Sequence, residues 1–313
     1  MSTVGDVRRV LGVENECGLP DAVAIGGAST LDAPMPGTLV FAKRVDDRAR
    51  ETIANHPSTL FLVPRDSVSV LSAVGNHLFV NNPRLAFGTV VDQLFLPRKR
   101  PSIASTATVE DGATIGSEVH IGHGAVVEAG AEIGDCVTIG HNSVILGRVK
   151  IGSGSVVGAN TTIGGVGFGL EFDVDGLPFR IPHVGGVRIG CKVEIGNNCS
   201  IARGTIGDTV LEDYVKLDDQ VFVAHNALIK EAAFLIAGSL TSGSVIVGRR
   251  AWVAPGAVIT NGVKLGDDVM LGLGAVVVSN IPERSLAVGL PAKVRGANPR
   301  LPRLDIDEME SDV

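Results

Sequence analysis

Residues 133–163 read IGDCVTIGHNSVILGRVKIGSGSVVGANTTI, and in this stretch an aliphatic residue returns at every sixth position. A helix repeats its apolar positions every 3.6 residues and a strand every second residue, so neither produces a period of six over this length. A fixed internal period of this kind predicts a solenoid of hexapeptide repeats. The aliphatic positions of the stretch are Ile133, Ile139, Ile145, Ile151, Val157 and Ile163.

The same period extends well beyond this stretch, from residue 103 to residue 277. It breaks after Ile163, resumes at Ile189 and slips once more before Leu211. Because each coil of a solenoid buries its inner face only against its neighbours, this repeat must supply most of the core. Its further positions are Ile103, Val109, Ile115, Ile121, Val127, Ile195, Ile201, Leu217, Val223, Ile229, Leu235, Thr241, Val247, Val253, Ile259, Leu265, Leu271 and Val277.

Three hexads predict one triangular coil of about 18 residues, and successive coils are expected to stack at about 4.8 Å, the spacing of neighbouring strands. The interior of such a coil is thin and takes medium aliphatic side chains. The chain accordingly has 45% hydrophobic but only 4% aromatic residues. We expect Gly or Asn to take the tight turns at the corners, where a positive φ costs them little.

Composition and charge exclude several classes of function. The net charge of −7 argues against a nucleic-acid groove. No stretch approaches the roughly 20 apolar residues of a membrane span, and the N-terminus lacks the pattern of a signal peptide. The four cysteines show no CxxC spacing, which favours free thiols. We therefore expect a cytoplasmic protein.

Residues 1–100 do not follow the period and alternate short apolar runs with helix-like segments, which predicts a small α/β domain. A basic linker bracketed by Pro97 and Pro101 should lead into a solenoid at 102–281. Residues 282–313 should form a C-terminal cap and an acidic tail. The elements expected in the first domain are strands at 22–25, 38–41, 59–63 and 77–80 and helices at 46–55 and 83–94.

One insertion, residues 164–188, interrupts the solenoid and holds Phe168, Phe172 and Phe179. A long insertion at one point of a regular repeat is often a binding device. The alternative is a plain excursion of one corner.

Seven histidines are candidates for proton transfer, since an imidazole titrates near neutral pH. Three of them, His123, His141 and His225, stand two positions after an inward aliphatic residue, so a corner role is an alternative for each. Periodicity does not choose among them. The other four are His56, His77, His120 and His183.

The segment 164–226 reads GGVGFGLEFDVDGLPFRIPHVGGVRIGCKVEIGNNCSIARGTIGDTVLEDYVKLDDQVFVAHN. Its GFG, IP, VEIG, RG, DT and AHN elements resemble the LpxD family, the UDP-3-O-(3-hydroxyacyl)glucosamine N-acyltransferases of lipid A synthesis. NNPRLAFGTVVDQLF at 81–95 resembles the same family. The resemblance implies a left-handed parallel β-helix, a homotrimer with active sites between subunits, and an N-terminal domain that holds the uracil of the acceptor.

The resemblance also implies roles for single residues. His225 of the AHN element would be the general base on the sugar amine. Gly243, one coil of 18 residues later, would donate its N–H to the oxyanion, although a corner glycine is the alternative. Asn226 would orient the imidazole or bind substrate, and Asp219 or its neighbour Asp218 could fix the tautomer of the ring.

Phe41 would stack on uracil, or else pack in the core. Phe168 and Gly169 of the insertion would touch the acceptor or the donor arm.

The C-terminal part resembles CoA-dependent hexapeptide acetyltransferases through GLGAVVVSNIPERS and GLPAKVRG, at 272–285 and 289–296. Lys293 and Arg295 would then lie near the phosphates of CoA, with a structural cap as the alternative. Trp252 should face outward, at a subunit contact or the donor groove.

These observations predict a mainly β protein, a β-helix preceded by a small α/β domain, that acts as an N-acyltransferase. It would move an acyl group from a thioester carrier, with acyl carrier protein favoured over CoA, to the amine of a nucleotide-linked sugar, and it would hold no permanent cofactor. The alternatives are a CoA-dependent acetyl- or acyltransferase and a non-catalytic solenoid. A zinc site on His120, His123 and His141 is a remote fourth possibility, since such sites need three histidines.

Overall fold

The computed structural model describes residues 1–14, 17–71, 75–97 and 100–297. The chain divides into two compact units, Met1–Arg98 and Lys99–Val313, each with its own hydrophobic core. The acidic tail expected from the sequence lies outside the described residues.

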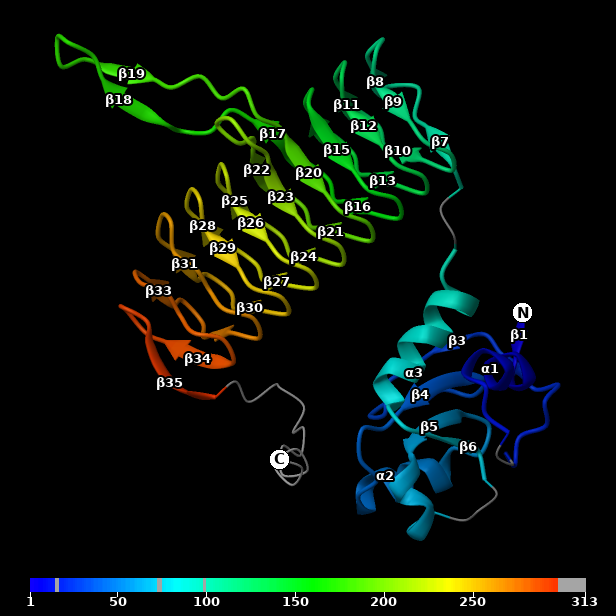
Figure 1. Cartoon of the computed structure of the whole chain (residues 1–313). Helices are drawn as coiled ribbons and strands as arrows, with labels where there is room; N and C mark the ends of the chain where they lie inside the picture. Colours follow the sequence, from blue (N-terminus) through cyan, green and yellow to red (C-terminus); the bar gives the residue numbers. More distant parts are fainter. Residues whose placement is uncertain (15–16, 72–74, 98–99, 298–313) are drawn as a thin grey trace, which may run out of the picture. The chain divides into compact units, whose positions relative to one another are not determined.

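The first unit is built on a parallel sheet in the order β3-β4-β5-β6, with helices packed against it (Figure 1). Leu39, Leu60, Leu62 and Leu78 fill its core. The helices expected at 46–55 and 83–94 are present, and a further helix, α1, precedes them. The elements are β1 (Ser2–Thr3), α1 (Val4–Leu11), β2 (Ala24–Ile25), β3 (Gly27–Ala28), β4 (Thr38–Phe41), α2 (Asp47–Asn55), β5 (Leu60–Pro64), the 3₁₀ turn η1 (Arg65–Ser69), β6 (His77–Val80), α3 (Pro83–Val90) and the π turn η2 (Val91–Phe95).

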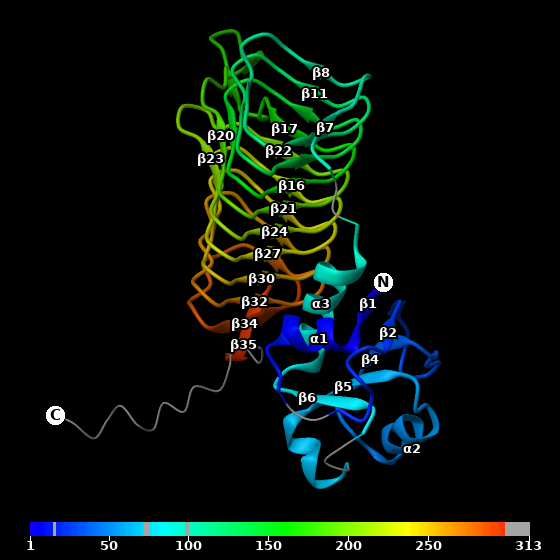
Figure 2. The ribbon, with the colours of Figure 1, turned by 90° about the vertical axis from the view of Figure 1, so that its right-hand side faces the viewer.

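The second unit is a parallel β-helix with three faces, and its coils stack in sequence order (Figure 2). The first face holds β7 (Ser102–Ile103), β10 (His120–Ile121), β13 (Thr138–Ile139), β16 (Val156–Val157), β21 (Glu194–Ile195), β24 (Lys216–Leu217), β27 (Phe234–Leu235), β30 (Trp252–Val253), β32 (Met270–Leu271), β34 (Ser285–Val288) and β35 (Lys293–Ala297).

The second face holds β8 (Thr108–Val109), β11 (Val126–Val127), β14 (Val144–Ile145), β17 (Thr162–Gly165), β22 (Ser200–Ala202), β25 (Phe222–Val223), β28 (Leu240–Thr241), β31 (Val258–Ile259) and β33 (Val276–Val277). The third face holds β9 (Thr114–Ile115), β12 (Glu132–Ile133), β15 (Val149–Ile151), β20 (Val187–Ile189), β23 (Thr209–Leu211), β26 (Leu228–Ile229) and β29 (Ile246–Val247).

The inward aliphatic positions follow the predicted period. Thr138 pairs with His120 on one side and Val156 on the other, so one coil takes 18 residues. From Ile121 onward the inward residues are buried, but Ile103 is 54% exposed. The expectation that Ile103 is a core residue is therefore wrong, because the first coil has a neighbouring coil on one side only.

Gly and Asn take many of the corners with positive φ, as predicted, for example Gly130 at 82° and Asn142 at 56°. Several corner residues with positive φ are neither Gly nor Asn, for example Arg148 at 62° and Tyr214 at 61°. The glycines that follow the inward aliphatic residue instead make room for the next coil. A Cβ on Gly140 would lie 2.5 Å from the backbone carbon of Gly158, closer than real Cβ contacts. Close stacking of coils, more than turn conformation, requires these glycines.

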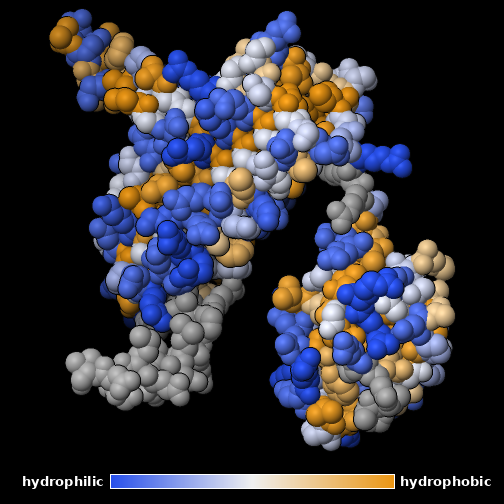
Figure 3. All heavy atoms as spheres, turned by 45° about the vertical axis from the view of Figure 1, so that its right-hand side comes forward, coloured by the Kyte–Doolittle hydropathy of each residue, from blue (hydrophilic) through white to orange (hydrophobic). Residues whose placement is uncertain are grey.

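The insertion forms an arm, defined here as residues 166–184, that projects from the β-helix (Figure 1). Its two strands, β18 (Leu170–Phe172) and β19 (Pro178–Arg180), pair as an antiparallel hairpin. Phe168, Phe172 and Phe179 are all more than half exposed, and apolar atoms gather on the surface of the arm (Figure 3). The base of the arm lies beside the corner that carries His225.

Candidate active site

His225 lies at the corner between β25 and β26, where the second face turns into the third. The next residue, Asn226, takes the left-handed conformation with a φ of 60°, which Asn tolerates better than most residues. The corner leaves the imidazole half-buried.

The side chain of Asn226 ties this corner together. Its Oδ1 accepts a hydrogen bond from the backbone N–H of Thr205 at 2.7 Å. Its Nδ2 donates to Oγ1 of Thr205 at 3.1 Å and lies 3.1 Å from Nδ1 of His225. The backbone N–H of Asn226 donates to Oγ1 of Thr209 at 2.9 Å. Because a backbone N–H can only donate, Thr205 sets the orientation of the amide.

This orientation assigns the resting tautomer of His225. The amide nitrogen of Asn226 is a donor, so Nδ1 of the imidazole must accept. The neutral ring then carries its proton on Nε2. The predicted orienting role of Asn226 thus has a defined geometry. Within the described residues, no carboxylate hydrogen-bonds to this ring.

Gly243 contacts the outer edge of the His225 ring, one coil later. A Cβ on Gly243 would lie 2.6 Å from Cε1 and 2.8 Å from Nε2 of the imidazole, and 2.7 Å from Oδ1 of Asn261. The next backbone N–H, that of Ser244, donates to the carbonyl of His225 at 2.9 Å. Within the described chain, no hydrogen bond occupies the N–H of Gly243. The structure therefore brings His225 and Gly243 together. The imidazole occupies the space that a side chain at residue 243 would take, so only glycine fits there.

A second imidazole, that of His183, packs against His225. The two ring centroids are 5.1 Å apart, with the rings nearly perpendicular. His183 is buried, and its Nδ1 lies 2.9 Å from the carbonyl oxygen of Ile181. A carbonyl can only accept, so this ring holds its proton on Nδ1 and has its lone pair on Nε2. That buried Nε2 has no hydrogen-bond partner among the described residues.

Burial lowers the pKa of His225 below its ordinary value, and the charge that His183 can carry lowers it further. Both effects favour the neutral imidazole. A neutral ring at physiological pH is the form that can take up a proton.

Asp219 is not brought to this ring. It lies at the corner between β24 and β25, one hexad earlier. Its Oδ1 accepts from the backbone N–H of Asn197 at 2.6 Å and from Nδ2 of the same residue at 3.0 Å. Asn197 in turn accepts from the N–H of Ala159 at 2.8 Å. A side-chain ladder thus ties successive coils together, and Asp219 is one rung of it. Oδ2 of its neighbour Asp218 accepts a hydrogen bond from the backbone N–H of Ala237 at 3.3 Å.

Two other candidate histidines, His123 and His141, belong to a similar ladder of side chains between successive coils. Nδ1 of His141 accepts from the N–H of His123 at 2.8 Å, and the two rings stack at 5.7 Å. They lie at the same type of corner as Asp219. In the described part of the chain, no group of three His, Cys, Asp or Glu residues is arranged to hold a metal ion.

The two predicted residues of the arm lie at its base, near the imidazole pair. A Cβ on Gly169 would lie 3.1 Å from Cε1 of His183. Phe168 is 72% exposed, and the guanidinium carbon of Arg180 lies 5.0 Å from its ring centroid. Gly169 therefore borders the site, while the Phe168 ring faces solvent in the single chain.

The three predicted donor-binding residues lie on the first face, which does not carry His225. Trp252 faces outward and its ring lies 5.4 Å from that of Phe234. Lys293 and Arg295 are exposed on β35, which pairs with β34 in antiparallel fashion at the end of the stack.

Phe41 lies in the first unit, in a pocket of about 590 Å³ between β4, α2 and α3. Its ring centroid lies 5.0 Å from that of Phe87. Lys43, Arg44 and Arg48 also line the pocket, together with Asp32 and Asp46. Arg48 is paired with Asp32 at 2.7 Å. The apolar wall of Phe41, with Lys43 and Arg44 beside it, suits a ligand with an aromatic ring and phosphate groups.

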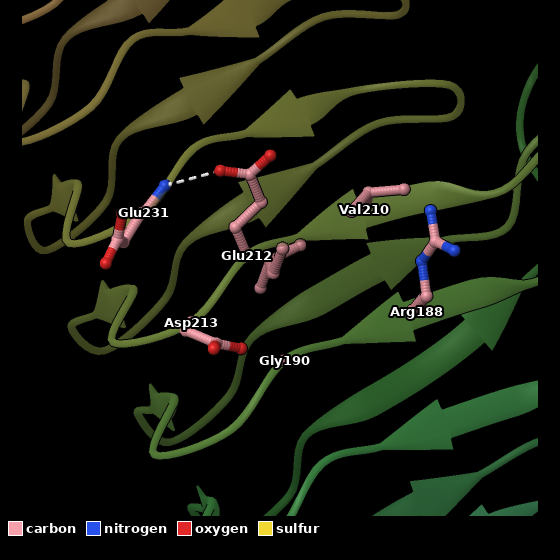
Figure 4. Close-up of a pocket in the computed structure, with 7 residues that line it drawn as sticks. Arg188, Gly190, Val210, Glu212, Asp213 and Glu231 are labelled. Atoms are coloured by element: carbon pink, nitrogen blue, oxygen red, sulfur yellow. Dashed lines mark hydrogen bonds between the residues drawn. The ribbon is translucent and has the colours of Figure 1, made fainter.

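A second groove, of about 410 Å³, lies on the third face over β20 and β23 (Figure 4). Two of its acidic side chains accept hydrogen bonds from neighbouring coils. Oε2 of Glu212 accepts from the N–H of Glu231 at 2.9 Å, and Oδ1 of Asp213 accepts from the N–H of Cys191 at 2.7 Å.

Among the described helices, none has the length and apolar content to cross a bilayer.

The sequence analysis counted His183 among the candidate histidines but did not predict that it lies in the site. It lies on the return segment of the arm, outside the six-residue period, so periodicity gave it no weight. The signal that could have found it is the GFG element at 167–169. A Cβ on Gly167 would lie 2.6 Å from Nε2 of His183 and 2.9 Å from Cβ of His225, so this glycine is needed where the two histidines meet.

The fold is a parallel β-helix of hexapeptide repeats, and known proteins with similar sequences and folds are acyltransferases. Residues 130–165 match the family model described as bacterial transferase hexapeptide (six repeats). Among solved structures, UDP-N-acetylglucosamine acyltransferase from Campylobacter jejuni is similar with a TM-score of 0.60 and 26% identity, over 66% of this chain and 81% of that one. A Bacteroides fragilis LpxA structure has a TM-score of 0.57 at 25% identity, covering 63% of this chain and 75% of that one. The predicted fold class, a left-handed parallel β-helix after a small α/β unit, is confirmed.

The curated relatives with similar sequences are N-acyltransferases. UDP-3-O-acylglucosamine N-acyltransferase 2 of Legionella pneumophila (strain Paris) is 50% identical over 182 residues, 52% of this chain and 52% of that protein. UDP-3-O-acylglucosamine N-acyltransferase of Bordetella parapertussis is 36% identical over 132 residues, 41% of this chain and 36% of that protein. The chain thus spans about a third to a half of the length of these relatives. The resemblance to the LpxD family predicted from the sequence is confirmed.

Proposed function

We propose that this protein is an N-acyltransferase that moves an acyl group from a carrier thioester to the amine of a nucleotide-linked amino sugar. The observation that carries the proposal is the corner of His225, Asn226 and Gly243. An oriented neutral imidazole lies there beside a backbone N–H that has no hydrogen-bond partner among the described residues. The names of the curated relatives point to the same reaction.

The chemistry needs an acceptor for the proton of the attacking amine. His225 takes this proton, and its lowered pKa keeps the ring neutral and ready. To accept at Nε2, the ring must first move its proton to Nδ1, which breaks the bond from Asn226. The cost is about that of one hydrogen bond, roughly 1 kcal/mol. The imidazolium then returns the proton to the departing thiolate.

The thioester carbonyl develops negative charge as the amine attacks. The N–H of Gly243 donates to this oxyanion, and the absence of a side chain at this residue lets the carbonyl approach. The C–S bond then breaks, the C–N bond is complete, and the thiol leaves. No permanently bound cofactor takes part, because the acyl thioester is a cosubstrate.

The acceptor is bound by its nucleotide in the first unit, residues 1–100, with Phe41 against the base. Lys43 and Arg44 suit the phosphates. The resemblance to LpxD favours uridine as the nucleoside and acyl carrier protein as the donor. Asn226, Gly169 and Phe168 border the sugar or the acyl chain. Trp252 would contact the donor or a neighbouring subunit, and Lys293 and Arg295 would lie near the phosphates of CoA, so CoA is the alternative donor.

The active assembly is a cytoplasmic homotrimer with each site at a seam between subunits. The apolar side chains of the arm support this, because soluble monomers rarely expose large contiguous apolar patches. Sedimentation of the full chain tests it directly: the expected species is a trimer, and a monomer with full activity contradicts it.

The decisive experiment is mass analysis of products from UDP-, dTDP- and GDP-linked amino sugars, each incubated with acyl carrier protein thioesters or acyl-CoA. We expect an N-acylated UDP-sugar from the carrier-protein donor. His225→Ala should lower kcat by roughly 10²–10⁴-fold with the assembly intact. Transfer from CoA alone rejects the favoured donor, and near-normal turnover of the variant rejects the histidine mechanism.

A further inference from the structure

His183 is a buried imidazole that the reaction described above does not use. It stands on the return segment of the arm, and its Nε2 carries a lone pair with no partner in the described chain. Leaving a buried acceptor unpaired costs about 1–3 kcal/mol. A cost of this size is tolerated where the group has a role in the site.

The contacts of His183 connect it to the ring of His225 on one side and to the arm on the other. Its ring meets the His225 ring at 75°, with centroids 5.1 Å apart. Its Nδ1 donates to the carbonyl of Ile181, and the N–H of Ile181 donates to the carbonyl of Gly169 at 2.9 Å. Gly167 packs so closely that an added Cβ would lie 2.6 Å from Nε2 of His183 and 2.9 Å from Cβ of His225.

Two segments contact opposite ends of the His225 side chain. Gly243 of the next coil borders the Nε2–Cε1 edge, where substrate would bind, and the base of the arm borders the Cβ side. A side chain free to rotate about its Cβ would leave the Nε2 edge undirected. His183 and Gly167 remove this freedom from the arm side.

We propose that His183 is a positioning residue for His225: it holds the ring of the base towards Gly243, and it makes that hold depend on the conformation of the arm. The inference rests on the proposed role of His225. A ligand or subunit that moved the arm would in this way change the orientation of the base.

The charged groups brought to this region by the surrounding elements are each engaged with the backbone. None of them hydrogen-bonds to either imidazole in the described chain, so the two rings share the site as the nearest titratable pair. The groups are Arg180, whose Nη1 donates to the Gly167 carbonyl at 3.3 Å, Arg203, whose Nε donates to the Gly164 carbonyl at 2.6 Å, Asp208, whose Oδ1 accepts from the Gly186 N–H at 2.9 Å, and Arg148, which donates to the Val184 carbonyl.

Two variants separate positioning from mere packing. His183→Ala removes the ring, opens the Cβ side of His225 to water and takes away the neighbouring imidazole that lowers the pKa of His225. His183→Phe keeps an aromatic ring of similar extent at the same place. Val174→Ala at the tip of the arm, where the side chain is fully exposed, is the matched control.

The first readout needs no substrate: NMR titration of ¹³C-labelled histidines in the full chain, with His225 assigned from the spectrum of His225→Gln. We expect the midpoint of His225 to rise towards its ordinary value in His183→Ala, to rise less in His183→Phe, and to stay unchanged in Val174→Ala. An unchanged midpoint in His183→Ala overturns the proposal. This result stands even if no acyl transfer is found.

The second readout is the transfer rate with the donor and acceptor that the product analysis identifies. We expect His183→Ala to lower kcat about tenfold, as a misdirected catalytic group does, with KM little changed. His183→Phe should restore most of this loss. Equal losses in the Ala and Phe variants, or a rate in His183→Ala equal to that of the unaltered protein, contradict the positioning role.

Discussion

The side-chain nitrogen of Asn226 lies 3.1 Å from Nδ1 of His225, and the backbone N–H of Thr205 fixes which end of the amide faces the ring. The resting imidazole therefore has its proton on Nε2, the atom that must later accept one. A neutral amide at this place makes His225 a weaker base than a carboxylate would.

Asn226→Asp tests this relationship. The carboxylate can still accept from the N–H of Thr205, and Asp also tolerates the left-handed conformation, so the corner should survive. The new charge favours the Nδ1–H tautomer and raises the pKa of His225. We expect ¹⁵N NMR of the imidazole to show the tautomer change. A ring that remains in the Nε2–H form contradicts the assignment.

Gly243→Ala should displace the imidazole, because the new Cβ would lie within 2.8 Å of both Cε1 and Nε2 of His225. A shift of about 1 Å in a catalytic group lowers the rate about a hundredfold. Gly207→Ala is the control, since a Cβ there meets nothing within 4 Å and no positive φ is involved. Steady-state kinetics of both variants check this, and equal rates contradict the predicted contact.

Thr241→Val should stabilise the β-helix. Thr241 occupies an inward aliphatic position, is fully buried, and its hydroxyl has no hydrogen-bond partner among the described residues. Val has nearly the same shape without the unpaired group, so we expect a gain of about 1 kcal/mol in unfolding free energy. Urea denaturation measures it.

Thr161→Val provides the opposite case. The Thr161 hydroxyl donates to the carbonyl of Gly196 at 2.8 Å and accepts from the N–H of Cys199 at 3.0 Å. Removing it leaves both groups unpaired, and we expect a loss of about 1–3 kcal/mol. Equal effects of the two substitutions would show that hydroxyl pairing does not decide stability here.

The pH dependence follows from the lowered pKa of His225. The unfolded chain binds this proton more readily than the folded one. The resulting stability is fully present above the unfolded pKa, near 6.5, and is lost as pH falls towards the folded pKa. Activity should likewise persist somewhat below pH 6.5 and then fall. A kcat/KM profile whose acid limb lies above pH 6.5 contradicts this.

Phe41→Ala should weaken binding of a uridine diphosphate to the first unit by about 1–3 kcal/mol, the usual contribution of base–aromatic stacking. Leu85→Ala is the control, because Leu85 is 67% exposed and lies outside this pocket. Isothermal titration of the full chain with UDP checks the prediction. Unchanged affinity returns Phe41 to a core-packing role.

The β-helix could be predicted because its core is one-dimensional: each inward side chain meets only its counterparts one coil away, so a local period states which residues are buried. For the same reason the stacking of Gly243 on His225 followed from counting 18 residues. The corner glycines were predicted, but the role of the glycines that follow an inward aliphatic residue was not, since it depends on how closely the neighbouring backbone approaches.

The sequence by itself thus determined the solenoid, its coil length and the stacking of residue 243 on residue 225, because these are set by a fixed spacing along the chain. The outward place of Trp252 was predicted from its size, and the choice of His225 from the resemblance to LpxD. Only the tertiary structure decided what lies beside the imidazole. Thr205, which orients the amide of Asn226, and His183 reach it through a corner conformation and a folded arm, and contacts between segments of unrelated spacing leave no period in the sequence.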